Sequence, residues 1–166
     1  LYRWHQDGAA LSYPDEELHW QLGWNLVHEG QLVSDDGRYA ARMPLYPLFL
    51  ALFAWLGTWG VLVARLTQAL LGAVSTMIAV RLCDAAAGSR AAWLGGLLVA
   101  FDPFGVFFAN LLLTEALFTT IALALVASTW QWLVSRRGNA WVVWGVALLG
   151  PAAILTRPSA AALIPL

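Results

Sequence analysis

The chain has 166 residues, of which 60% are hydrophobic and only 11% are charged, and its formal net charge is −1. Since an ordinary soluble domain carries about 25% charged residues, this composition argues against a soluble globular domain and indicates a membrane protein. Cys83 is the only cysteine, which excludes an internal disulfide and a cysteine-based metal cluster. We expect a piece of a longer polypeptide, because the chain starts at Leu1 and ends inside an apolar run at Leu166.

Most acidic residues lie in the front part of the chain, and we assign 1–43 to a juxtamembrane loop and helix. Seven of the ten acids precede residue 40. The segment from about Pro14 to Glu29 is predicted to be a helix. Its apolar face is formed by leucines at every fourth position, Leu18, Leu22 and Leu26. Gly30 is expected to end the helix, and a turn-rich loop with "SDDG" at 34–37 follows.

The rest of the chain, 44–166, reads as a transmembrane helical region. A helix that crosses about 30 Å of hydrocarbon needs roughly 20 apolar residues. Four segments approach this length: Val61 to Cys83, Ala91 to about Leu113, Thr114 to Val134, and Trp141 to about Leu155. A further span from Pro158 onward is left open, and the shorter apolar stretch Pro44 to Gly57 suits an interfacial or re-entrant helix. The predicted fold class is therefore all-α, a polytopic transmembrane helical bundle with about four spans and juxtamembrane helices.

The arginines predict which ends of the spans face the cytoplasm. Arg81 and Arg90 flank the turn after the first span, and Arg136 and Arg137 lie in the turn after the third. Positive residues favour the cytoplasmic side. The acid-rich front and the junction at 110–115 should then share the extracytoplasmic surface.

The acids Asp15, Glu16 and Glu115 are the candidates for chemistry. A simpler interpretation exists for the first two, because Ser12 could be an N-cap and acids in a first helical turn gain about 0.3–1 kcal/mol each from the helix dipole. Glu115 could likewise belong to a first turn capped by Thr114. However, an ionisable residue at the edge of a transmembrane bundle is costly to bury and is a functional candidate by default. Helix capping alone does not predict that Asp15 and Glu115, which are far apart in the sequence, face the same outward surface.

Two arginines before the first apolar stretch, Arg38 and Arg42, have two interpretations as well. They could balance nearby acids or extend to the membrane interface. Alternatively they bind an anionic lipid headgroup, because a guanidinium matches phosphate oxygens. Asp102, next to a proline, either faces a polar cavity or marks a helix break, and the depth of Arg157 is left open.

The histidines and the known motif classes indicate no other chemistry. His5, His19 and His28 show no metal-ligand spacing. The sequence contains no phosphate-binding glycine loop, nucleophile elbow or zinc motif.

Several short motifs occur together in an order typical of one enzyme family. They are "DE" at 15–16, "EG" at 29–30, a basic residue before "PLYP" at 44–47, "ARLTQALLGAVSTM" at 64–77, "LTEALF" at 113–118 and "LTRP" at 155–158. In this order the chain resembles GT-C-type membrane glycosyltransferases, in the bacterial branch similar to protein O-mannosyltransferases and the lipid A aminoarabinose transferase. The resemblance covers about Asp15 to Pro158 and implies the N-terminal part of a GT-C-like fold. The chain departs from the pattern of the aminoarabinose transferase at two positions. That enzyme has a basic residue at the position of Leu18 and an aspartate at the position of Glu115.

The resemblance implies roles for individual residues. Asp15 falls where the family has its catalytic carboxylate, Arg42 where it has a basic residue on the donor phosphate, and Glu115 where it has a second acid. We keep Glu16 as a further catalytic candidate and Arg38 as a further phosphate-binding candidate. A positioned base typically contributes 10²- to 10⁴-fold, and a guanidinium stabilises a leaving phosphate most as its charge grows.

The resemblance also implies partners and a location. The expected donor is a polyprenyl phosphate that carries one sugar, transferred with inversion to a lipid, glycan or protein acceptor. The expected location is the bacterial plasma (inner) membrane, as a multi-pass protein whose active site faces the extracytoplasmic side. No nucleic-acid partner and no certain cofactor are predicted, and the sequence leaves open whether a divalent metal assists.

A non-catalytic polytopic protein, either a transporter or an assembly subunit, is the alternative. Its outward acids would bind a cation or keep the loop in water. Transporters tend to show broken helices in two related halves, and this chain shows no such internal symmetry.

Overall fold

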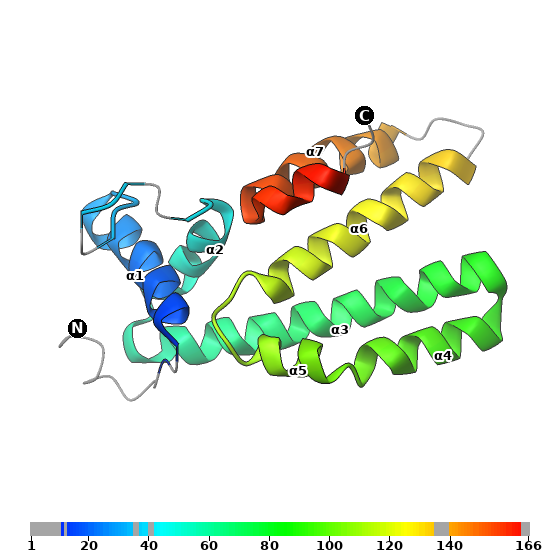
Figure 1. Cartoon of the computed structure of the whole chain (residues 1–166), viewed down its shortest axis with the longest axis horizontal. Coiled ribbons are helices and arrows are strands. Elements are labelled where there is room, and N and C mark those ends of the chain that lie inside the picture. The colour runs from blue at the N-terminus through cyan, green and yellow to red at the C-terminus, as the bar shows by residue number, and fades with distance from the viewer. Residues whose placement is uncertain (1–10, 12, 35–36, 40–41, 135–139, 164–166) are drawn as a thin grey trace.

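The computed structural model describes residue 11 and residues 13–34, 37–39, 42–134 and 140–163, and these residues form an all-helical structure (Figure 1). The helices are α1 (Pro14–Glu29), α2 (Leu45–Ala54), η1 (Gly57–Trp59), α3 (Gly60–Ala87), α4 (Ser89–Ala100), α5 (Pro103–Ala109), α6 (Glu115–Val134), α7 (Ala140–Thr156) and η2 (Pro158–Leu163). Within these ranges the only β-type pairing is an isolated antiparallel bridge between Val33 and Tyr39. The sequence predictions for His5, Ser12, Arg136 and Arg137 lie outside the described residues.

Helix α1 has the predicted bounds, but its start and its buried face differ from the prediction. The N-cap position is Tyr13 and not Ser12, and the Tyr13 carbonyl accepts the first backbone hydrogen bonds without a side-chain cap. Gly30 ends the helix in the left-handed conformation, φ 70°, which glycine adopts without steric cost. The buried face is more polar than the leucine spacing predicted, because it contains Glu16, His19, Trp20, Leu22, Gly23 and Asn25.

Helix α2 is short, as predicted for the stretch after Pro44, and it packs closely on α1. The closest approach is at Gly23, where an added Cβ would lie 3.1 Å from the Cβ of Leu50 and from the Pro47 carbonyl oxygen. The absence of a side chain at this position therefore lets the two backbones approach.

Two helices, α3 together with η1 and α6, are long and apolar enough to cross a membrane. The α4–α5 pair, bent by 49°, makes a third if it counts as one broken span. Helix α7, which covers the predicted fourth span, is apolar but has only 17 residues, and η2, in place of the further span left open from Pro158, has six. Much of the surface of these helices consists of exposed large apolar side chains, which is typical of contact with lipid.

The predicted second span is wrong as one continuous helix. It breaks at Asp102, whose carboxylate accepts hydrogen bonds from the backbone N–H groups of Phe104 (3.3 Å) and Gly105 (2.8 Å). Asp102 is thus the N-cap of α5, followed by Pro103 at the first helical position. The helix break predicted for Asp102 is confirmed, and Asp102 also lines a cavity between the helices.

The helices form one elongated bundle with α1 across one end (Figure 1). Helix α3 packs against α4 and α6, and α6 packs against α7. A buried hydrogen bond of 2.9 Å between the hydroxyls of Ser75 and Thr120 joins α3 to α6. The turn from α3 to α4, with Arg81 and Arg90 beside it, lies at the end of the bundle opposite α1.

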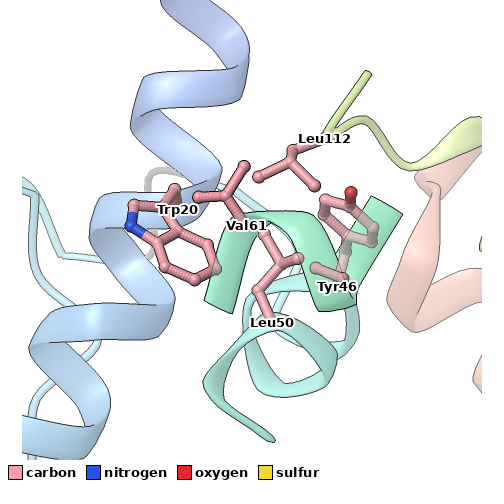
Figure 2. Close-up of a cluster of buried hydrophobic side chains, with 6 residues drawn as sticks. Trp20, Tyr46, Leu50, Val61 and Leu112 are labelled. Carbon is pink, nitrogen blue, oxygen red and sulfur yellow. The ribbon is translucent and has the colours of Figure 1, made fainter. Parts of the chain in front are cut away.

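The apolar core lies where α1, α2 and the start of α3 meet the segment before α6 (Figure 2). Its buried members are Trp20, Tyr46, Leu50, Val61, Ala64 and Leu112. This core holds the amino-terminal helices against the end of the bundle, and the polar site described next surrounds it.

Candidate functional site

Among the described residues, three carboxylate–guanidinium pairs lie at the end of the bundle where α1 crosses it. They are Asp15 with Arg42, Glu16 with Arg65, and Glu115 with Arg157. Their residues come from α1, α3, α6, the segment before α2 and the segment after α7. Residues far apart in the sequence are therefore brought to one region by the fold.

The outermost pair joins Asp15 to Arg42. The Arg42 guanidinium donates to Oδ1 of Asp15, and their side chains are 42% and 61% exposed. Such an exposed pair contributes little stability, roughly 0–1 kcal/mol. Both groups therefore remain accessible to a ligand, and either can exchange its partner at small cost.

The central pair is buried. Oε1 of Glu16, whose side chain is fully buried, accepts a 2.8 Å hydrogen bond from the backbone N–H of Leu112 and a 3.4 Å contact from the guanidinium of Arg65. A buried carboxylate requires such partners, because an uncompensated buried charge costs several kcal/mol. Glu16 therefore links α1 to α3 and to the segment before α6.

The segment 111–114, which leads into α6, is also held from α3. The side-chain amide of Gln68 donates to the carbonyl oxygens of Leu111 (3.0 Å) and Leu113 (3.3 Å). This irregular segment carries backbone groups that no helix satisfies, and Gln68 and Glu16 satisfy three of them.

The third pair lies beside a groove. Arg157 donates to Oε1 of Glu115 at 3.0 Å, and its guanidinium lies 5.8 Å from the ring centroid of Phe118. Glu115 is 25% exposed in its side chain and lines a cavity of about 680 Å³ between α3, α5 and α6. The remaining lining is largely apolar, and its further polar members are Ser75, Thr76, Asp102, Asn110 and Thr119. Glu115 is therefore the acid at which an apolar groove meets the charged end of the bundle.

Tyr46 and His19 lie between the pairs, with their rings edge to face at 4.9 Å. Burial lowers the pKa of His19 to about 4, with the positive charge of Arg42 acting in the same direction and Asp15 against it. Burial raises the pKa of Tyr46 above its usual range, and the charges of Glu115 and Glu16 add to this. Both side chains are therefore neutral near pH 7, and Tyr46 lies within electrostatic reach of both glutamates.

Among the described residues, some buried polar atoms of this region meet no hydrogen-bond partner of standard geometry. They include Nδ1 of His19, the hydroxyl of Tyr46 and Oε1 of Gln68. Unsatisfied polar atoms are uncommon in protein interiors, and strain, a catalytic role or a bound water or ion explains those that occur.

The structure places the predicted site residues as follows. Asp15, Glu16, Arg42 and Glu115 come to the same end of the bundle, whereas Arg38 lies in an exposed turn whose backbone pairs with Ser34.

The sequence analysis singled out Arg42 and named Arg157, but it did not predict which acid each would pair with. Arg65 and Gln68 were missed, although polar residues within an otherwise apolar span are a usable signal. Tyr46 and the pairing of Arg157 had no signal in the sequence, because both depend on contacts between distant helices.

Comparisons with protein-family models, with curated proteins and with solved structures each found no match. Among the described residues, no group of three or more His, Cys, Asp or Glu side chains could hold a metal ion.

Proposed function

We propose that this chain is part of an integral membrane glycosyltransferase of the GT-C type that transfers a sugar from a polyprenyl-phosphate donor to an extracytoplasmic acceptor. The observation that supports it best is the gathering of accessible acids and arginines at the end of a bundle of membrane-type helices. An amphiphilic donor needs a charged surface and an apolar surface, because its phosphate binds cationic groups and its lipid chain packs against apolar side chains.

The two ends of such a donor have matching surfaces here. Arg42 and Arg157 are 42% and 44% exposed, and a guanidinium binds phosphate through paired N–H donors. The apolar groove that ends at Glu115 suits part of a lipid chain. The protein would sit in a bacterial plasma membrane with this end outside, since Arg81 and Arg90 lie at the opposite end.

The Asp15–Arg42 pair suggests how the donor activates the site. A donor phosphate that binds Arg42 replaces the carboxylate of Asp15, which is then free to act as a base. Asp15 takes the proton of an acceptor hydroxyl as its oxygen bonds to the anomeric carbon. The bond from that carbon to the phosphate oxygen breaks, its electron pair stays on the phosphate, and the configuration inverts. Arg42 stabilises the charge that develops there.

Glu115 would orient the acceptor or the sugar beside the groove. The hydrogen bond from Arg157 holds this carboxylate in one orientation. Tyr46, which is neutral near pH 7, lies within electrostatic reach of Glu115 and adds no charge beside it.

The experiment compares variants at the two ends of the bundle. We would measure transfer by the full-length protein from labelled decaprenyl-phosphate sugars, and binding of decaprenyl phosphate with uncharged decaprenol as the reference. Asp15→Asn should reduce transfer by about 10²- to 10⁴-fold, and Arg42→Ala should weaken binding of decaprenyl phosphate but not of decaprenol. Asp84→Asn and Arg90→Ala, at the far end of α3 and the start of α4, are matched controls.

Normal transfer by Asp15→Asn would remove the proposed base. Equal binding of decaprenyl phosphate by the Arg42→Ala and Arg90→Ala variants would remove the phosphate site. Transport of a polar solute without any transfer would favour the non-catalytic alternative.

A further inference from the structure

We infer that Glu16 is a positioning residue which, together with Gln68, fixes the segment 111–114 and thereby the location of Glu115. Its effect on catalysis rests on the proposed function, whereas its hold on the segment does not. This assignment differs from the sequence-based one, which grouped Glu16 with the catalytic acids.

The contacts of Glu16 leave it no surface for a substrate. Its side chain is fully buried, and Oε1 already accepts from the Leu112 backbone and from Arg65. A general base must come within hydrogen-bond reach of the proton that it takes. Asp15, one residue earlier, is 61% exposed, and Glu115 lines the groove, so these two acids have the access that Glu16 lacks.

The segment that Glu16 holds is non-helical. Locally, the Leu111 N–H donates to the Phe108 carbonyl oxygen (3.2 Å) and the Leu113 N–H to the Leu111 carbonyl oxygen (2.8 Å). Its contacts with the rest of the fold include the Glu16 bond to Leu112, the Gln68 bonds to Leu111 and Leu113, and the burial of the Leu112 side chain (Figure 2). The first of these is charge-assisted and is therefore stronger than a bond between neutral groups. Release of this anchor would let the segment move.

Movement of this segment reaches Glu115 directly. Helix α6 begins at Glu115, immediately after the segment. Oε1 of Glu115 accepts a hydrogen bond of 3.0 Å from the guanidinium of Arg157, the residue that follows α7. A shift of about 1 Å in a positioned group can cost about 10²-fold in rate. Glu16 thus acts on the site through backbone geometry.

Three substitutions separate positioning from catalysis. Glu16→Gln keeps an oxygen that accepts from the Leu112 N–H, Glu16→Leu does not, and Gln68→Met removes the second anchor at similar size. Hydrogen exchange of the peptide that contains 111–114 reports the anchor, and transfer from the decaprenyl-phosphate sugar that the wild type uses reports the site. Asp15→Asn is the control that should lose transfer without any change in exchange.

In the Glu16→Leu variant we expect the backbone amide hydrogen of Leu112 to exchange about 10- to 100-fold faster and sugar transfer to be lost. The Gln68→Met variant should show a smaller increase in the exchange rate. Glu16→Gln should keep slow exchange and transfer within about tenfold of wild type. Loss of transfer in Glu16→Gln with slow exchange would show that the ionised carboxylate itself is catalytic and would overturn the inference.

Failure of the proposed function gives a different result. If the wild type transfers none of the sugars, the proposed function fails while exchange still tests the anchor. Unchanged exchange in Gln68→Met and Glu16→Leu would overturn the anchor itself. Should Glu16→Leu not fold, Gln68→Met and Glu16→Gln carry the test.

Discussion

Replacement of Gly60 by alanine should destabilise the joint between α1, α2 and α3. A Cβ added at Gly60 would lie 2.5 Å from the carbonyl oxygen of Phe53 and 2.7 Å from Cη2 of Trp20. The carbonyl is part of the backbone and the Trp20 indole is buried in the core, so neither can move freely. Overpacking of this kind costs about 1–3 kcal/mol.

Gly72→Ala, in the same helix, is the matched control. Nothing lies within 4 Å of a Cβ added at Gly72, so the substitution should stabilise α3 by about 0.5–1 kcal/mol through the lower conformational freedom of alanine. The two variants should therefore differ by at least about 1.5 kcal/mol in free energy of unfolding.

The assay is equilibrium unfolding of the purified protein in mixed micelles as the fraction of denaturing detergent rises, followed by circular dichroism. Binding of decaprenyl phosphate by the two variants shows whether the joint also supports the site, since Trp20 lies on the same face of α1 as Glu16. Equal stability of the Gly60→Ala and Gly72→Ala variants would refute the packing described for this joint.

Two further predictions concern single side chains. The low pKa of His19, about 4 beside Arg42 and Asp15, means that the unfolded chain binds a proton more tightly than the folded protein. The free energy of unfolding should fall by about 3 kcal/mol as the pH drops from 6.5 to about 4. The His19→Leu variant, unfolded at several pH values, should lack this loss. Parallel plots of unfolding free energy against pH for the two proteins would contradict the prediction. Asp102→Ala should cost the start of α5 about 0.5–2 kcal/mol. Faster hydrogen exchange over 103–109 would show this, and unchanged exchange would argue against the cap.

The roles of individual site residues could be predicted only in part from the sequence. Asp15, Arg42 and Glu115 stood out because ionisable residues are rare in so apolar a chain. Which of Asp15 and Glu16 faces solvent could not be predicted, since neighbouring helical positions differ in direction by about 100° and the choice of face depends on the partner helix. The pattern of leucines in α1 favoured one face, but packing against α2 and α3 buried another that contains Glu16 and His19.

Local signals in the sequence determined the helical class, the bounds of α1 at Pro14 and Gly30, the short α2 and the apolar lengths of α3 and α6. These properties depend on residues close together in the chain, through proline and glycine backbone preferences and hydrophobic length. Tertiary structure alone decided the pairing of Glu16 with Arg65 and Leu112, and that of Glu115 with Arg157. The physical reason is that a buried charge pairs with whichever group the packed helices bring within reach. The distance between such groups depends on helix packing and cannot be calculated from their spacing in the sequence.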